Sequence, residues 1–445
     1  MTIINLMQFG APDDGSMPVT DLVRHAIRQL ADNGGGELLF PKGLYRCGHI
    51  ELMDNITINL SEGAVLQLIP DISEMYHDLS IPPETWLPYY FIHANHCKNI
   101  TIRGKGTIDG CGRFFWEDTY MISGKKENEM DETRSVAFYD VLKPKAERPV
   151  LSYFSSCTNL KITEVTLTNS PAYTIWLNDC EDVLIDNIIV RNPRKGPNTD
   201  AVDIDCSEHV KILHCDIQAG DDCVAVKSDP YRTGTSRPCQ ELEVAFCTFS
   251  STTCAIRVGY EGNNPIQNCH FHDLEFKHCQ HGINILTVAP NCKAIPIHGT
   301  PIDHLVFENI IMNDVAQGLY VWAGREDSNY LFTGHLRDIT FKNISISSIA
   351  SSYIGGESPQ VISGLKFINV HLNVADSPAI AETVNPDTSV PSLWSGHFKV
   401  GGIFFQGTNA EIWDNTTVSC AQPGQPAIRK CQQNQSPKLL AWTLP

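Results

Sequence analysis

Three stretches of eight residues share one pattern of apolar side chains: LKITEVTL at 160–167, VLIDNIIV at 183–190 and VKILHCDI at 210–217. The first, third, sixth and eighth residues of each are apolar, which is typical of two short strands with period-two alternation. Five further copies begin at Leu242, Cys269, Leu305, Ile339 and Leu365, and successive copies start 23 to 36 residues apart. A unit this small cannot bury its apolar side alone, but stacked units share one core. The repeat therefore predicts an all-β fold, a right-handed parallel β-helix, rather than an antiparallel sandwich.

The N-terminal residues follow another pattern, with apolar residues at helical spacing between Asp21 and Leu30. We expect a helix that caps the open end of the coil stack, because an uncovered end coil is an exposed sheet edge. The triplet Gly34-Gly35-Gly36 lacks the GxGxxG spacing of a nucleotide-binding loop, so it predicts a tight turn before a strand.

We predict a single β-helix domain over residues 1–445. Residues 1–50 would form the N-terminal cap and first coil, residues 51–375 the remaining coils, and residues 376–445 an irregular C-terminal cap, since the repeat fades after about Ala375. A charged segment at 117–147 interrupts the pattern and predicts a long loop inserted between coils. Such loops often shape binding sites on rigid scaffolds, and a solvated insertion is the alternative.

Composition limits the partners and the location. The formal net charge of −18 argues against a nucleic acid or an anionic membrane as partner. No apolar run follows Met1 and no segment approaches the length of a membrane span, so we expect a cytoplasmic protein, although a secreted protein trimmed of its signal would look the same. Several of the 16 cysteines occupy inward positions of the repeat, among them Cys215, Cys247 and Cys269. Reduced thiols packed as small apolar groups are therefore expected rather than disulfides. The oligomeric state stays open.

Two acidic motifs follow successive copies of the repeat: Asn198-Thr199-Asp200 and, 21 residues after Asp200, Asp221-Asp222 behind Gly220. Equivalent positions of successive coils can bring the three carboxylates together. Closely packed carboxylates do not ionise independently, so their surroundings can divide them into an acid and a base, as hydrolysis of a glycosidic bond requires. The alternative is a pair of ordinary solvated Asx turns. We interpret Asp200, Asp221 and Asp222 as catalytic residues.

A second cluster, Cys269-His270-Phe271-His272 with His278, Cys279 and His281, resembles a metal site. Strand alternation points Cys269 inward and His270 and His272 outward, so the side chains diverge. Structural zinc needs four converging ligands, and we expect neither a metal nor a cofactor.

The chain resembles glycoside hydrolase family 28, the polygalacturonase family of the pectin-lyase-like β-helix proteins. Four segments are similar to characteristic segments of this family: GGG at 34–36, FPKGLY at 40–45, GKGTIDG at 104–110 and Arg148-Pro149. The two aspartate motifs are the most specific part of the resemblance. The resemblance implies that Asp221 protonates the leaving oxygen while Asp200 and Asp222 hold and deprotonate the attacking water. It also implies inversion of configuration, which needs carboxylates roughly 6.5–9.5 Å apart.

Two departures bear on the substrate. Where the family carries Gly-His-Gly, this chain reads TCAIRVG at 253–259, and Cys254 falls at the expected His. Where the family carries Arg-Ile-Lys, the chain has Asn284 and Leu286, so the cations that would grip a galacturonate carboxylate are missing. Arg257 could restore one of them, or could be a structural arginine paired with an acid.

We predict an inverting, exo-acting glycoside hydrolase on short oligosaccharides from pectin or a related plant cell-wall polysaccharide. The expected substrate-binding residues are Asn198, Arg257, Tyr260, Asn284 and Tyr320. Aromatic residues, including Tyr173, Trp176 and Trp322, would line a sugar groove, or would simply pack between coils. The alternatives are a lyase or epimerase, which would want a basic residue and often calcium, and a non-catalytic carbohydrate-binding β-helix.

Overall fold

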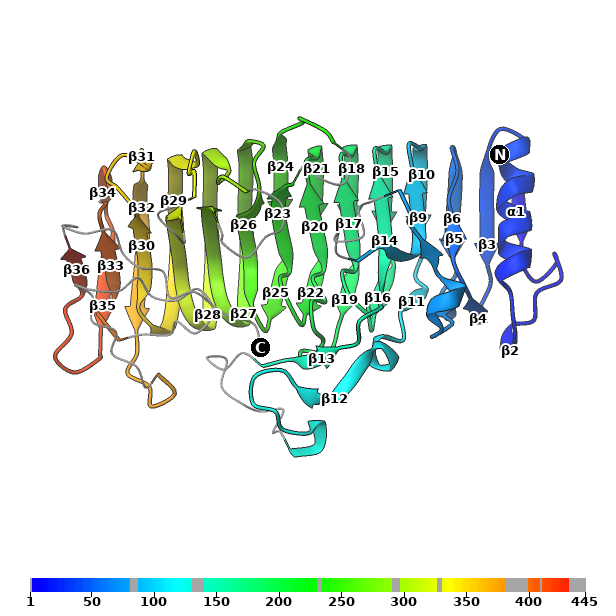
Figure 1. Ribbon diagram of the computed structural model, residues 1–445, viewed down its shortest axis with the longest axis horizontal. Coiled ribbons are helices and arrows are strands. Elements are labelled where there is room, and N and C mark those ends of the chain that lie inside the picture. The colour runs from blue at the N-terminus through cyan, green and yellow to red at the C-terminus, as the bar shows by residue number, and fades with distance from the viewer. Residues whose placement is uncertain are drawn as a thin grey trace. The chain divides into compact units, whose positions relative to one another are not determined.

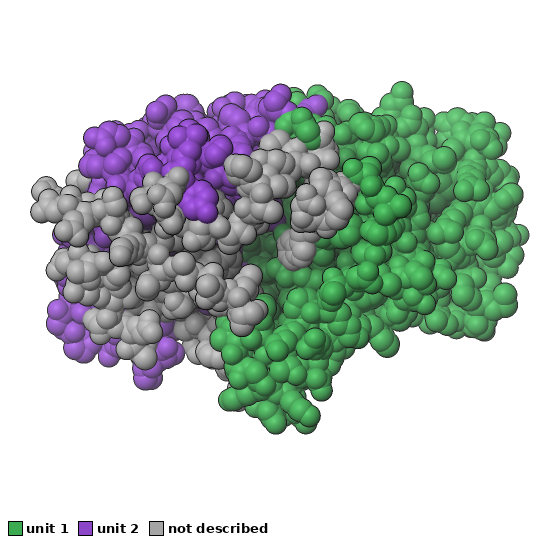
Figure 2. Space-filling model, viewed as in Figure 1, with its two compact units in different colours: residues 1–132, 140–224, 231–235 green, residues 133–139, 225–230, 236–445 purple. Residues whose placement is uncertain are grey.

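The computed structural model describes residues 2–80, 87–129, 140–229, 234–289, 297–325, 330–380, 399–408 and 410–431. The chain divides into two compact units, shown in Figure 2. The first comprises residues 1–132, 140–224 and 231–235, and the second residues 133–139, 225–230 and 236–445. Each unit is a stack of coils whose strands pair in parallel. The prediction of a single domain stays a prediction.

The first unit is built from three parallel sheets that run along its coils (Figure 1). The first sheet contains β1 (Thr2–Asn5), β3 (Gly36–Phe40), β6 (Ile56–Leu60), β10 (Lys98–Arg103), β15 (Thr158–Thr163), β18 (Glu181–Asp186) and β21 (Glu208–Leu213). The second contains β2 (Asp14–Pro18), β4 (Gly43–Cys47), β7 (Ala64–Leu68), β11 (Thr107–Asp109), β16 (Thr166–Thr168), β19 (Ile189–Arg191) and β22 (Asp216–Ala219).

The third sheet, which carries the site described below, contains β5 (Ile50–Glu51), β9 (Tyr89–Asn95), β14 (Pro149–Ser155), β17 (Ile175–Asn178) and β20 (Val202–Asp205). A short additional strand, β8 (Tyr76–His77), follows the 3-10 turn η1 (Ile72–Glu74) and pairs antiparallel with β9. After the first coil, which has only β1 and β2, the chain passes through all three sheets in each coil, so equivalent residues of successive coils become neighbours.

The pairing follows the register that the sequence repeat predicts. Leu160 lies opposite Val183, and Val183 lies opposite Val210 on the next coil. All three side chains are buried, because strand alternation directs them into the common core. Equivalent positions of the sequence repeat are therefore the positions that stack on one another in the structure.

The predicted N-terminal helix is confirmed as α1 (Thr20–Asp32), which buries Val23, Ala26, Ile27 and Leu30. It packs beside β3 at the N-terminal end of the first unit (Figure 1). The helix therefore covers the apolar end of that unit's core, as a cap should.

The insertion at 117–147 is partly regular. Before it lies η2 (Gly112–Phe115), and β12 (Trp116–Tyr120) then pairs antiparallel with β13 (Leu142–Pro144). The turn η3 (Glu127–Glu129) lies between them, and Arg113 and Lys195 both form ion pairs with Glu127. Residues 130–139 of the predicted loop lie outside the described residues.

The second unit repeats the arrangement with longer strands. Phe271, Phe307, Phe341 and Phe367 stack on successive coils with ring centroids 4.8, 5.4 and 5.1 Å apart. Its first strands are β24 (Cys239–Ala245), β25 (Thr248–Ser251), β26 (Cys254–Gly262), β27 (Ile266–Ala289), β28 (Pro301–Arg325), β29 (His335–Ala350), β30 (Ser352–Gly356), β31 (Ile362–Ser363) and β32 (Lys366–Val374). The strand β23 (Val224–Ser228) lies where the chain passes from one unit to the other.

The coils continue past residue 375, so the predicted start of an irregular cap there is too early. Strand β33 (Ile403–Gln406) pairs in parallel with β30, β34 (Ile412–Asp414) and β35 (Thr417–Cys420) pair with β32, and β36 (Ile428–Cys431) pairs with β33. Strands β34 and β35 expose most of their side chains, so they lack the apolar alternation that marks the earlier copies.

Turns between the strands explain the many asparagines. In the second unit Asn309, Asn343, Asn369 and Asn415 all have positive φ, and each donates a side-chain hydrogen bond to the equivalent asparagine or aspartate one coil earlier. Asparagine tolerates the left-handed region better than most residues, and stacking satisfies its amide. The cysteines among the described residues form no disulfide. Within the same residues, no helix is long and apolar enough to cross a membrane.

Candidate active site

The three predicted catalytic aspartates lie on consecutive coils of the first unit. Asp200 stands just before β20, and Asp221 and Asp222 stand just after β22. The backbone N–H of Ala201 donates to the Asp222 carbonyl at 2.9 Å, and the Thr174 N–H donates to the Asp200 carbonyl at 2.9 Å. Pairing between coils therefore fixes Asp200 beside Asp222.

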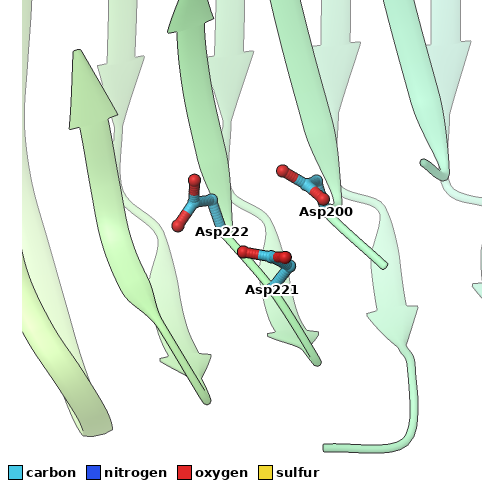
Figure 3. A group of neighbouring side chains, drawn as sticks. All are labelled: Asp200, Asp221 and Asp222. Atoms are coloured by element: carbon cyan, nitrogen blue, oxygen red, sulfur yellow. The ribbon is translucent and has the colours of Figure 1, made fainter. Parts of the chain in front are cut away.

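The side chains of the aspartates converge as the sequence predicts. One carboxylate oxygen from each of Asp200, Asp221 and Asp222 lies within 4.8 Å of the other two. Figure 3 shows the three carboxylates gathered in front of the two coils. Asp200 and Asp222 are each 3% exposed, and Asp221, at 9%, is the most accessible of the three. Solvated Asx turns would leave their carboxylates exposed, so the alternative of two ordinary Asx turns does not describe this site.

The 4.8 Å limit applies to one oxygen of each carboxylate, so it does not measure the separation of roughly 6.5–9.5 Å between the carboxyl groups of an inverting pair. That separation stays a prediction. The scaffold brings the acids together because neighbouring parallel strands are about 4.8 Å apart and the three residues come from adjoining coils.

Thr199 ties the two motifs together. Its hydroxyl donates to the Gly196 carbonyl at 3.1 Å and accepts from the Gly220 N–H at 3.1 Å. A Cβ on Gly220 would lie 2.4 Å from the Gly196 carbonyl oxygen, so only glycine allows this close approach. The residue before Asp221 is thereby locked to the residue before Asp200.

Arg148 positions the acid through Asn198. Its guanidinium donates to the Pro197 carbonyl at 2.6 Å and to the Asn198 side-chain oxygen at 2.7 Å. The amide of Asn198 then donates to Asp221 through a long contact of 3.4 Å. Asn198 has a φ of +51°, a conformation that this arginine helps to hold. The predicted binding residue Asn198 thus contacts a catalytic candidate.

The sequence analysis did not predict several other polar residues near the aspartates. Asn192 is fully buried and donates to the Thr174 hydroxyl at 2.8 Å and the Thr199 carbonyl at 3.2 Å. Asp203 and Asp205, on β20, are also buried. The alternation Val202-Asp203-Ile204-Asp205 was the available signal, since it puts both acids on the same side of their strand.

The remaining predicted binding residues lie in the second unit, where three of them share one register. Arg257 lies opposite Asn284, and Asn284 lies opposite Tyr320 on the next coil. The buried Arg257 donates to the Cys254 sulfur at 3.4 Å. Tyr320 belongs to a buried apolar cluster with Trp322 and Tyr353, and burial raises its pKa.

Tyr260, which has a positive φ, is partly exposed and packs against the same cluster. Packing between coils therefore accounts for the positions of Tyr320 and Trp322. The predicted groove residues Tyr173 and Trp176 pack in the first unit, in a cluster with Tyr90 and Tyr153.

His281 is a residue that sequence reasoning considered only as a metal ligand. It is buried on β27 directly opposite Cys254, at whose position the family carries a histidine. Its backbone N–H donates to the Thr253 carbonyl at 2.8 Å. The available signal was the dipeptide His281-Gly282 one coil later than the expected position.

Oxygen ligands suit hard cations such as calcium, and the aspartate trio is the one group of three or more converging His, Cys, Asp or Glu side chains among the described residues. Calcium takes six to eight oxygens, so three carboxylates supply part of a coordination shell.

The histidine cluster that resembled a metal site in the sequence lies elsewhere. The ring centroids of His270 and His272 are 4.2 Å apart on the outer face, and the two rings are near Glu308 and Glu243, respectively.

Comparison with known proteins places this β-helix, with its three converging acids, among the glycoside hydrolases. The chain belongs to glycosyl hydrolases family 28, whose family model matches residues 82–390. The predicted fold class, a right-handed parallel β-helix with an N-terminal capping helix, is confirmed.

A protein of Vitis vinifera described as "Probable polygalacturonase" is 28% identical over 303 residues, 64% of this chain and 56% of that protein. The chain spans about half the length of several curated relatives that it matches.

Two solved structures resemble the fold. The exopolygalacturonase of Thermotoga maritima has a TM-score of 0.67 at 20% identity and covers 94% of this chain and 88% of its own. The family 28 exopolygalacturonase of Yersinia enterocolitica has a TM-score of 0.70 at 18% identity, with 98% and 79% covered. At these identities the likeness establishes the fold.

We predict that Arg148→Lys lowers kcat roughly ten- to a hundredfold, because lysine cannot reproduce the forked contacts that hold Asn198 beside Asp221. Steady-state kinetics on a pectic oligosaccharide would measure this. The matched control is Arg103→Lys, since the Arg103 side chain is 46% exposed and pairs with Glu37. Equal kcat values for the two variants would contradict the positioning role.

Proposed function

We propose that this protein hydrolyses glycosidic bonds in oligosaccharides derived from pectin or a related plant cell-wall polysaccharide. The observation that carries the proposal is the convergence of three buried carboxylates, from Asp200, Asp221 and Asp222, within 4.8 Å of one another. Family membership supports it, and the polygalacturonase names of the relatives support a pectic substrate.

The proposed roles follow from accessibility and contacts. Asp221 is the most exposed of the three acids and is oriented by Asn198, which suits a general acid that must reach the substrate. It gives its proton to the glycosidic oxygen as the bond between that oxygen and the anomeric carbon breaks. Asp200 and Asp222 hold a water molecule, whose oxygen bonds to the anomeric carbon while one of them takes its proton.

Exo action, a short oligosaccharide as partner and a cytoplasmic location are also proposals. Exo action is supported by the likeness of the fold to two exopolygalacturonase structures. A reducing compartment is supported by the described cysteines, none of which forms a disulfide. Substrate contacts by Arg257, Tyr260, Asn284 and Tyr320 are also proposed. The shared register of Arg257, Asn284 and Tyr320 on successive coils supports three of them.

We expect Asp221→Asn to keep the fold and substrate binding while lowering turnover by about 10²–10⁴, because the amide cannot protonate a leaving group. Single-turnover kinetics on a substrate with a poor leaving group would measure the loss. A chelator should leave wild-type activity unchanged; activity that needs added calcium would favour a lyase. Near wild-type turnover of Asp221→Asn would remove Asp221 from the acid role.

The stereochemical prediction concerns the anomeric configuration of the first product. If Asp200 and Asp222 activate water on the face opposite Asp221, that product has the inverted configuration. Proton NMR of the earliest product, recorded before mutarotation, measures it. A retained anomer would show that one aspartate attacks the sugar directly, as the close approach of the carboxylates would also allow.

The specificity prediction concerns galacturonate. Because Asn284 and Leu286 replace the family's cation pair, a carboxylate bound there would lack those two charge partners, at a cost of several kcal/mol. We therefore expect neutral or mixed pectic oligosaccharides to have a higher kcat/KM than digalacturonate. Arg257→Ala should lower any remaining activity on digalacturonate. If digalacturonate is the best substrate and stays so in Arg257→Ala, the specificity proposal is wrong, although the three-aspartate mechanism would stand.

A further inference from the structure

A pocket of about 200 Å³ opens on the third sheet of the first unit, where the additional strand β8 pairs with β9. Its described lining includes the aromatic residues Tyr76, Tyr90, His93 and Tyr153 and the polar residues Asp78 and Asn95. The catalytic proposal uses none of these residues. Because β8 belongs to no repeat copy, the pocket is an addition to the coil plan.

Stacked rings form the apolar part of this pocket. Tyr76 stacks on His93 with centroids 4.3 Å apart and planes 9° from parallel, and Tyr90 stacks on Tyr153 at 4.3 Å and 18°. His93 is held in turn by a 2.7 Å hydrogen bond with His49. Tyr76 is thus fixed in place and yet 37% exposed. A rigid aromatic surface of this kind suits the C–H face of a pyranose ring.

Polar groups surround the rings. Asp78 accepts from the Ser80 N–H at 3.0 Å and from the Tyr90 hydroxyl at 3.4 Å, which fixes its carboxylate at the pocket. Asn95, Ser155 and Ser156 add amide and hydroxyl groups that can both donate and accept. The combination of aromatic faces with several small hydrogen-bonding groups matches a sugar, which has an apolar face and a rim of hydroxyls.

The charge of the pocket selects among sugars. Its described lining contains the carboxylate of Asp78 and no lysine or arginine. The histidines in the lining are His93 and His96. Burial lowers the pKa of His93, which disfavours its charged form. A uronate carboxylate here would face Asp78 with no lysine or arginine beside it in the described lining, and like charges at close range repel. A neutral sugar meets no such penalty.

The pocket lies on the third sheet, whose strand β20 begins at Val202, two residues after Asp200. His93 is in register with Tyr153, Tyr153 with Trp176, and Trp176 with Asp203. These are three strand spacings, which together are about 14 Å. Asp200 stands three residues before Asp203, so the pocket and the bond to be cleaved are separated by a few sugar residues.

We propose that the pocket formed by Tyr76, Asp78, Tyr90, His93, Asn95 and Tyr153 is a distal binding subsite for a neutral sugar residue of the oligosaccharide substrate. The inference rests on the proposed function for the nature of the ligand. It makes the substrate a mixed saccharide, in which a neutral unit lies a few residues from the cleaved bond and on the Asp200 side of the aspartate trio.

The test is direct binding to the full chain carrying Asp221→Asn, which keeps ligands intact. The probes are the methyl glycosides of galactose, rhamnose, arabinose and xylose, with methyl galacturonate glycoside carrying a free carboxylate as the anionic comparator. Isothermal titration calorimetry gives Kd. We expect at least one neutral glycoside to bind more tightly than the anionic one, and Tyr76→Ala to weaken its binding about tenfold. His77→Ala is the matched control, because the exposed His77 adjoins Tyr76 on β8 but stacks on Tyr89 instead.

A second variant keeps the proposal falsifiable if Tyr76→Ala fails to fold. Asp78→Asn should raise the affinity for the anionic glycoside relative to the neutral one, because it removes the facing charge. The proposal is overturned if no neutral glycoside binds, if Tyr76→Ala binds it like His77→Ala, or if Asp78→Asn leaves the preference unchanged. Because binding is read without turnover, a wild-type chain that hydrolyses no pectic oligosaccharide would overturn the proposed function and leave this subsite standing.

Discussion

Hydrogen bonding between consecutive parallel coils is the constraint on which the structure depends. Each strand lies about 4.8 Å from its equivalents one coil earlier and one coil later, and the register is exact enough for Leu160, Val183 and Val210 to stack. A slip by one residue would turn every apolar side chain outward. The core therefore fixes the register, and the register fixes where each polar side chain on the outer surface lies.

The aspartate site exploits this constraint at an electrostatic cost. One oxygen of each carboxylate lies within 4.8 Å of the other two, and burial strengthens the repulsion between the charged forms. The surrounding residues offset this cost with fixed polar contacts. Thr199 locks the two motifs together, and Arg148 reaches Asp221 through Asn198. A rigid backbone can hold such a group of acids, whereas a loop would let them move apart.

The sequence was sufficient to predict the β-helix, the capping helix and the convergence of Asp200, Asp221 and Asp222, because each depends on a periodic pattern or on equivalent places in successive coils. It was insufficient for Arg148 and Asn192, whose partners are fixed by the path of the turns rather than by the repeat. The coil after residue 375 was missed because strands β34 and β35 are largely exposed and carry no apolar alternation.

The coil architecture also places the catalytic aspartates and the proposed sugar-binding pocket in different kinds of structural element. The aspartates occupy turns whose backbone is tied to both neighbouring coils, so a change there disturbs the stack. The pocket beside Tyr76 depends instead on β8, a strand outside the repeat that pairs with β9 alone. Such an addition can change without altering the register of the core or the place of the acids. Membership in the family constrains the first of these regions, and the second is where a chain of the same fold can acquire a substrate preference of its own.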